Sequence, residues 1–446
     1  MKTLIFILLI FGASCLNAQE IYFPPLLGNS WDTLTPSQLD WDESKLPALY
    51  EFLDENNTKA FILLKDGKIV LEKYFASFEQ YNSWYWASAG KTLTAALVGI
   101  AQYEGLLSIE DKSSKYLGTG WTSSPSDKED LITIRHQLTM TSGLDDTVED
   151  LFCTDKECLH YMADAGTRWS YHNAPYTLLD KVVESASGKS YNAYFTEKIK
   201  NKIGMSGLWI KTGYNNIYWS NPRSMARYGI LIQNRGNWDG AEIISDKNYL
   251  DDMVNTSQQL NKSYGYLWWL NGKESFMLPQ LQIVFPGKLF PDAPDDVIAA
   301  MGANGQLLNV CNSQGIVFVR MGDKPNNEND IGPIFNNEIW KYLNKIIQNP
   351  NSVFNSSQDN ELIIHPNPAA EYIEINLEAI KSTFKHGLDE NQEIKIYNTM
   401  GECVTTTSFP LTGSGNDNLR IDISQLPVSL YFIQIGNYTK KFVVVR

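Results

Sequence analysis

A serine and a lysine three residues apart are the side chains whose spacing points most directly to chemistry. The segment Ser88–Lys91 opens the apolar run 92–100, and this pattern predicts a helix that begins near the serine and ends near Gly105. A spacing of three places the two side chains one turn apart on the same helix face. The hydroxyl would then lie beside an amine, near the positive end of the helix dipole.

Tyr171-His172-Asn173 follows far along the chain and offers the groups that such a serine needs. A tyrosine and an asparagine brought to the serine would complete a nucleophile with its proton relay, which predicts acyl transfer through an acyl-enzyme on Ser88. The alternative is that Ser88 only caps a buried helix. A second Ser-x-x-Lys, Ser382 to Lys385, lies among polar residues and is interpreted as coincidence.

Five stretches, in this order along the chain, resemble the motifs of one family. They are Ser88–Lys91, Ile132–Leu144, Arg168–Asn173, Ser224–Gly229 and Gly302–Gln306. On these motifs, residues from about 40 to 345 resemble the serine β-lactamase and penicillin-binding-protein superfamily. Within it they resemble most the class C-type branch of esterases, D-amino-acid-processing peptidases and 6-aminohexanoate-dimer hydrolases.

The resemblance implies a role for each predicted site residue. Ser88 is the nucleophile, and Lys91 and Tyr171 act as a coupled acid–base pair in which either could be the acylation base. Tyr171 would protonate the leaving group. Asn173 would hold Lys91 and the acyl amide of the substrate, whereas a plain turn asparagine is the alternative. His172, between them, is expected to point away from the site.

The third family motif departs from its usual pattern. Aligned on Gly305, its first position usually holds Lys or His, but here it is Ala303. The backbone N–H groups of Ser88 and of Gln306 are expected to form the oxyanion hole. In the peptidases and β-lactamases of this superfamily, recognition of the substrate carboxylate depends on this cation, which is missing here. The pattern therefore favours esters or amides without a carboxylate beside the scissile bond.

The main domain is expected to be α+β, a two-lobe β-lactamase-like fold followed by a small all-β sandwich. Two apolar strand pairs, near the two ends of this domain, should meet in one antiparallel sheet covered by helices. An amphipathic helix follows the second pair, and the stretch from Ser88 to Leu250 should form a mostly helical lobe. The site would lie between the lobes. The strands are expected at 60–64, 69–75, 306–311 and 315–321, and the amphipathic helix at 334–347.

Composition narrows the possible partners and cofactors. The chain has 446 residues and a net charge of −14, which argues against nucleic acid or an anionic membrane surface as a partner. The histidines are scattered, so we expect no metal site and no cofactor. Cys153 and Cys158 could close a small disulfide loop or remain free thiols. The aromatic run 264–269 could supply pocket wall but is more typical of core.

The two ends of the chain carry export patterns. Residues 1–18 form a predicted signal peptide, too short for a membrane span, although Gly12–Cys15 could be a lipoprotein box. Residues 19–348 are the predicted hydrolase domain, and 349–361 form a polar linker.

Residues 362–446 carry several motifs near the end of the chain, namely His365–Ala369, Met400-Gly401, Leu426–Ile433 and Lys440–Phe442. With these motifs they resemble the type A sorting domain of the type IX secretion system, found in Bacteroidetes. A carbohydrate-binding or adhesive sandwich is the alternative. The resemblance implies that the secretion machinery is a partner and that the protein is secreted or placed on the cell surface.

The sequence thus predicts a secreted serine hydrolase that acts on a small-molecule amide or ester. A D,D-peptidase or class C-type β-lactamase is the second hypothesis. A catalytically inactive binding protein on the same fold is the third. The presence of Ser88, Lys91 and Tyr171 together argues against the third hypothesis.

Overall fold

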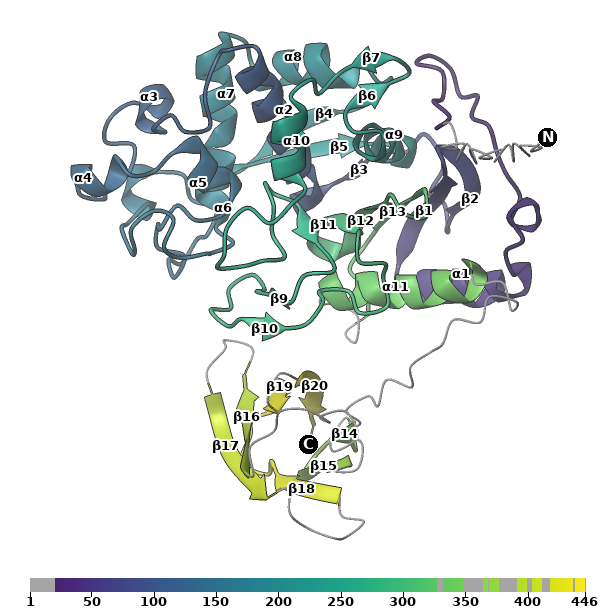
Figure 1. Ribbon diagram of the computed structural model, residues 1–446, viewed down its shortest axis with the longest axis vertical. Coiled ribbons are helices and arrows are strands. Elements are labelled where there is room, and N and C mark those ends of the chain that lie inside the picture. The colour runs from purple at the N-terminus through teal and green to yellow at the C-terminus, as the bar shows by residue number, and fades with distance from the viewer. Residues whose placement is uncertain are drawn as a thin grey trace, which may run out of the picture.

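The computed structural model in Figure 1 contains a large α+β domain and a smaller all-β domain. The predicted signal peptide at 1–18 and the predicted linker at 349–361 lie outside the described residues. The structure describes residues 21–326, 332–347, 364–367, 369–376, 391–398, 403–410, 418–435 and 438–445.

A six-stranded antiparallel sheet forms the framework of the large domain. Two of its strands come from the start of the domain and the others from its end. The two groups pair through β1 and β13, with Leu63 opposite Phe318. This pairing confirms the prediction that the two ends of the domain meet in one sheet. In spatial order the strands are β2 (Lys68–Tyr74), β1 (Thr58–Lys65), β13 (Ile316–Gly322), β12 (Gln306–Cys311), β11 (Ile298–Gly302) and β8 (Trp269–Leu270).

Helices cover both faces of this sheet. On one face, α1 (Leu46–Glu55) packs beside α11 (Gly332–Ile347), and Trp340 of α11 donates its indole N–H to Asn309 Oδ1 of β12 at 3.0 Å. On the other face lies α9 (Pro222–Gln233). A Cβ on Gly229 would stand 2.4 Å from Val317, so the absence of a side chain lets the helix approach the strands closely.

The second lobe is mostly helical, as predicted, and is built around α2 (Lys91–Tyr103). Residues 91–101 of this helix are all buried, because neighbouring helices surround it. A disulfide joins Cys153 to Cys158 in a loop of this lobe. The other helices of the lobe are α3 (Ser114–Leu117), α4 (Ser126–Glu129), α5 (Ile134–Leu138), α6 (Asn173–Thr177), α7 (Leu179–Ser187), α8 (Tyr191–Phe195) and α10 (Lys247–Met253).

A small sheet in this lobe was not expected from the sequence. It has the order β3 (Trp84–Tyr85), β5 (Asn215–Ser220) and β4 (Leu208–Thr212). β3 is too short to show a period of its own, and it forms because Trp84 and Tyr85 pair with Ser220 and Trp219. Two further short hairpins are β6 (Asn237–Trp238) with β7 (Ala241–Glu242) and β9 (Ser275–Phe276) with β10 (Phe285–Pro286).

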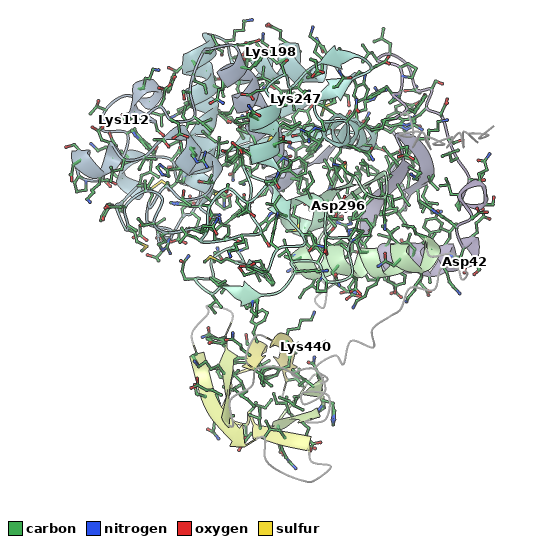
Figure 2. All side chains as sticks on the ribbon, in the orientation of Figure 1. Asp42, Lys112, Lys198, Lys247, Asp296 and Lys440 are labelled. Atoms are coloured by element: carbon green, nitrogen blue, oxygen red, sulfur yellow. A yellow bond between two sulfur atoms is a disulfide. The ribbon has the colours of Figure 1, made fainter. Side chains whose placement is uncertain are left out.

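Charged side chains lie mainly at the periphery, as the labelled Asp42, Lys112 and Lys198 illustrate in Figure 2. Lys112, for example, pairs with Asp130 at 2.9 Å on the surface of the helical lobe. Within the described residues, no helix combines the length and the apolar character that crossing a bilayer requires.

The C-terminal domain has a hydrophobic core of its own, which includes Ile373, Ile396 and Ile433. The strands form two antiparallel sheets. One is β14 (Ile364–His365), β15 (Tyr372–Asn376) and β18 (Asn418–Asp422), and the other is β17 (Cys403–Pro410), β16 (Asn391–Tyr397), β19 (Ser429–Ile435) and β20 (Tyr438–Val444).

The contact between α9 and the sheet yields a stability prediction. Gly229→Ala should lower the free energy of unfolding by about 1–3 kcal/mol, because the new methyl group overlaps Val317 and Leu308. Urea denaturation of the two proteins measures the difference. Gly332→Ala is the matched control, since a Cβ there meets open space. Equal destabilisation by both substitutions would contradict the packing argument.

Candidate active site

Ser88 is held at the start of the helical lobe by the buried Trp86, which lies two residues before it. The Trp86 N–H donates to the carbonyl of Tyr218 at 2.9 Å, and the indole N–H donates to Ser220 Oγ at 2.8 Å. Ala87 follows with a φ of 46°, in the left-handed region that a residue with a side chain rarely adopts. Ser88 lies in the 3₁₀ turn Ala87–Gly90, directly before α2. Strain of this kind persists where surrounding contacts hold the backbone, and it is typical of functional sites.

Lys91 extends its amine between Ser88 and the start of α6. Lys91 Nζ donates to Ser88 Oγ at 2.9 Å and to Asn173 Oδ1 at 2.9 Å. The residue is buried, and both acceptors are neutral. Burial lowers the pKa of the Lys91 amine to about 7, because a desolvated ammonium is disfavoured. The structure therefore brings together the side chains of Ser88, Lys91 and Asn173.

Tyr171 lines the same cavity as Ser88 and lies close to Lys91. Its ring stacks on Trp269 with centroids 5.8 Å apart, and the Lys91 amine lies 5.2 Å from the ring centroid. Burial raises the pKa of the Tyr171 phenol to about 12, although a hydrogen bond with Ser88 acts in the opposite direction. At neutral pH the phenol therefore carries its proton.

The turn between β11 and β12 brings Gly302 against the serine segment. A Cβ on Gly302 would stand 2.3 Å from the Trp86 carbonyl oxygen and 3.0 Å from the Ala89 nitrogen. The nearest atoms to a Cβ on Gly305 would instead belong to Arg320 and Phe335. The geometry thus favours Gly302, three residues before the glycine used in the sequence alignment, as the glycine that packs beside the nucleophile.

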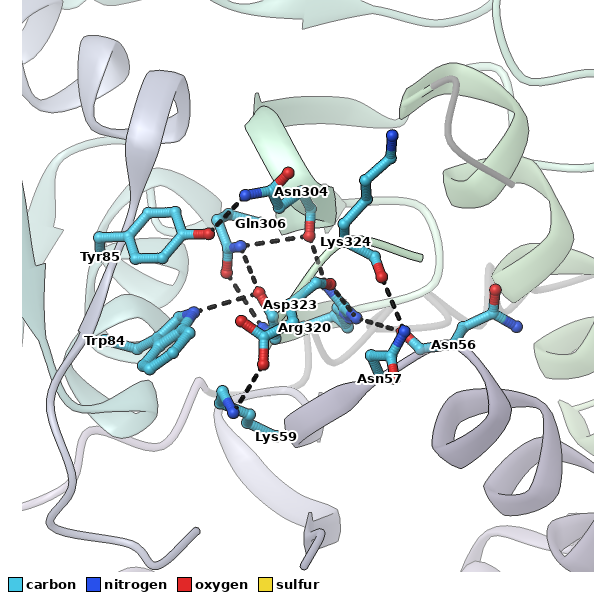
Figure 3. Close-up of polar contacts among 11 residues, drawn as sticks. Asn56, Asn57, Lys59, Trp84, Tyr85, Asn304, Gln306, Arg320, Asp323 and Lys324 are labelled. Atoms are coloured by element: carbon cyan, nitrogen blue, oxygen red, sulfur yellow. Dashed lines mark hydrogen bonds and ion pairs between the residues drawn. The ribbon is translucent and has the colours of Figure 1, made fainter. Parts of the chain in front are cut away.

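Gln306 and Arg320 hold this turn from beneath. The Gln306 side chain donates to the carbonyl of Gly322 at 2.6 Å and accepts from its N–H at 3.1 Å. The buried Arg320 guanidinium donates to the carbonyls of Asn304 at 2.7 Å and Gly305 at 3.0 Å (Figure 3). Gln306 does not line the cavity described below, whereas Gly305 does. Sequence analysis missed Arg320, because an arginine in a strand carries no local mark of the carbonyls that it will meet.

Two further predictions concern side chains near the site. His172 is buried and is not among the residues that line the cavity, in agreement with the expectation that it points away. Burial lowers the pKa of His172 to about 4, so its imidazole is neutral. The aromatic run 264–269 is buried as core, but Trp269 also forms cavity wall.

A cavity of about 430 Å³ opens in front of Ser88. None of its lining residues that the structure describes carries a charge, and most are apolar. The described part of the chain contains no group of three or more His, Cys, Asp or Glu side chains that could hold a metal ion. The lining consists of Ser88, Tyr171, Trp269, Leu278, Pro279, Leu281, Met301, Gly302, Ala303, Asn304, Gly305, Gly332, Pro333 and Phe432.

The fold and the position of this cavity agree with a known family. The β-lactamase family model matches residues 56–331, which is more than half of the chain, so the protein belongs to the β-lactamase family. Members of this family are generally serine hydrolases. A second family model, the secretion system C-terminal sorting domain, matches residues 363–445. The C-terminal domain is therefore a sorting domain, which implies the secretion machinery as a partner and a place at the cell surface or outside the cell.

Individual relatives are distant. A penicillin-binding protein of Bacillus subtilis is 29% identical over 136 residues, which is 27% of this chain, and the chain spans only 29% of that relative's length. A candidate 6-aminohexanoate-dimer hydrolase of Bacillus anthracis shares the fold with a TM-score of 0.55 at 20% identity, covering 74% of this chain and 92% of that one. A candidate β-lactamase of Bacteroides dorei has a TM-score of 0.54 at 19% identity, covering 69% and 99% of the two chains.

The lowered pKa of Lys91 predicts how activity depends on pH. Below a pKa of about 7 the amine is protonated and cannot accept the serine proton, so kcat/KM for an ester should rise with pH through about 7. Initial rates between about pH 5.5 and 8.5 measure this profile. Lys91→Arg, which keeps the charge at every pH in this range, should be inactive throughout. A profile of the wild-type enzyme that stays flat across the range would contradict a role for the Lys91 amine.

Proposed function

We propose that this protein is a secreted serine hydrolase that cleaves small esters or amides through an acyl-enzyme on Ser88. One observation carries the proposal. The buried Lys91 amine lies 2.9 Å from Ser88 Oγ and has a pKa lowered to about 7. A serine hydroxyl is a weak nucleophile unless a base removes its proton, and a neutral amine at this distance can do so.

The lowered pKa of Lys91 and the raised pKa of Tyr171 suggest a different role for each member of the acid–base pair. Lys91, neutral above about pH 7, accepts the proton of Ser88 as the hydroxyl attacks the acyl carbon. Tyr171, whose pKa is raised to about 12, keeps its proton and donates it to the leaving alcohol or amine. Water then attacks the acyl-enzyme and releases the acid.

The tetrahedral intermediate needs two hydrogen-bond donors for its oxygen. The N–H of Ser88 is one donor, as in the sequence-based prediction. We propose the N–H of Ala303 as the second in place of that of Gln306, because Ala303 follows Gly302 and lines the cavity. Asn173 fixes the Lys91 amine through its Oδ1 atom and leaves its amide N–H₂ for the substrate.

The neutral lining supports a substrate without a carboxylate beside the scissile bond. No residue from Ile298 to Gln306 is cationic, so this conclusion does not depend on which glycine belongs to the third motif. An incoming carboxylate would lose water without gaining a charged hydrogen bond. A D,D-peptidase or β-lactamase activity is the second candidate, favoured by the similarity to the penicillin-binding protein. The proposed mechanism uses no cofactor.

Substitutions of the proposed nucleophile and acid test the assignment. Ser88→Ala should abolish both ester turnover and labelling by a fluorophosphonate probe, with an unchanged circular dichroism spectrum. Tyr171→Phe should lower kcat by about 10²–10⁴, the usual share of a general acid–base. Tyr176→Phe is the matched control, because its ring also lies near Lys91, at 4.3 Å, but does not line the cavity. Wild-type activity in Ser88→Ala would overturn the proposed function.

Substrate preference tests the neutral cavity. A p-nitrophenyl ester should have a higher kcat/KM than a chromogenic cephalosporin, whose carboxylate finds no cation in the lining. Ala303→Lys should raise the value for the cephalosporin relative to the ester by about tenfold or more, since a charged hydrogen bond contributes about 1.5–3 kcal/mol. Ala303→Met adds length without charge and is the control. A preference of the wild-type enzyme for the cephalosporin would favour the second candidate function.

A further inference from the structure

Phe432 belongs to the sorting domain in sequence but lies at the active site in space. It lines the cavity together with Ser88 and Tyr171. It is 9% exposed and packs with the hydrophobic core of the hydrolase domain, whereas Tyr431 and Ile433, its neighbours in β19, pack in the core of the sorting domain. One strand therefore contributes to two cores.

The alternation of side chains along β19 explains this arrangement. Tyr431, Ile433 and Ile435 point to the inside of the sorting domain, so Phe432 points outward. On that outer face it stands opposite Tyr397 of β16 and Lys441 of β20. A phenyl ring in this position would meet water if the sorting domain stood alone, and here the hydrolase domain buries it.

The β9–β10 hairpin of the hydrolase domain receives this ring. Phe285 of β10 meets Phe432 with ring centroids 5.7 Å apart and an angle of 57° between the rings. Phe285 in turn stacks on Phe276 of β9 at 5.3 Å, which fixes its position. Figure 1 shows β19 and β20 next to this hairpin, and β10 contacts β20 directly. The docking surface is thus aromatic and continuous with the wall of the cavity.

We propose that the sorting domain docks on the β9–β10 hairpin and narrows the active-site cavity with Phe432, so that the chain is held in a low-activity state while the domain is docked. The proposal rests on the proposed function of the cavity. The Phe432 ring forms part of the wall of the cavity in front of Ser88, so a substrate that needs more than the remaining space must displace the ring. Undocking of the sorting domain would therefore widen the access to Ser88.

A cap of this kind has a defined kinetic effect. Only the undocked fraction of molecules binds substrate, so the apparent KM of the full chain exceeds that of the open enzyme by the inverse of this fraction. Saturating substrate displaces the cap, so kcat stays the same. A variant that merely damages the fold would lower kcat and would not lower KM, which separates the two explanations.

Point variants of the full chain test the cap. Phe432→Ala should lower KM for a p-nitrophenyl ester by about tenfold at unchanged kcat. Val404→Ala removes an exposed apolar side chain from β17 of the same domain and should leave KM unchanged. Phe285→Ala does not alter a cavity-lining residue and should lower KM as Phe432→Ala does. The double variant should show no additional decrease, because both substitutions break one contact.

The possible failures can be told apart. If all variants show Ser88-dependent turnover with the same KM, the cap is overturned and the hydrolase function stands. If no variant shows turnover, the proposed function fails, and small-angle X-ray scattering then decides on docking alone. A smaller radius of gyration for the wild-type chain than for the Phe285→Ala Phe432→Ala variant supports docking. Equal values overturn it.

Discussion

The burial of the Lys91 amine among neutral partners is the constraint on which the site depends. A carboxylate in contact with it would hold the ammonium charged and leave no base for Ser88. The described contacts provide two neutral acceptors instead, the hydroxyl of Ser88 and the amide oxygen of Asn173. The buried helix α2 and the surrounding rings keep water away from the amine. The cost of desolvation therefore lowers the pKa of this amine enough for the proposed role of Lys91 as a base near neutral pH.

Keeping that amine buried requires three separate parts of the chain to converge. Ser88 lies in the 3₁₀ turn directly before α2, Lys91 begins α2, and Asn173 begins α6. The third part is β11, whose Gly302 leaves no space for a side chain against Trp86 and Ala89. Arg320 fixes the turn that follows by binding two of its carbonyls. The left-handed backbone at Ala87 is tolerated because the buried Trp86 is held on both its backbone and its indole ring.

Features carried by local patterns could be predicted from the sequence, while features set by distant contacts could not. Continuous apolar, β-rich runs predicted the strand pairs of the main sheet, and the spacing of Ser88 and Lys91 predicted that these two side chains meet. The third motif was different, because Gly302 and Gly305 lie at the two ends of the same short turn between β11 and β12. Only the packing of Gly302 on the Ser88 segment distinguishes them. The sequence left open whether Cys153 and Cys158 form a disulfide or remain free thiols, and the structure joins them in a disulfide. Phe432 gave no local signal, since one outward phenylalanine in a strand is unremarkable.

The neutral cavity and the uncharged base are parts of the same electrostatic arrangement. A carboxylate bound beside Ser88 would lie close to Lys91 and would raise the pKa of the amine, which favours the protonated form. A family member that binds a carboxylate can offset this effect with a third-motif cation, which attracts the anion and repels the ammonium. This chain has no cation between Ile298 and Gln306. A charged substrate would therefore favour the protonated form of the proposed base and hinder the activation of Ser88, whereas a neutral acyl group leaves the pKa of Lys91 where burial sets it.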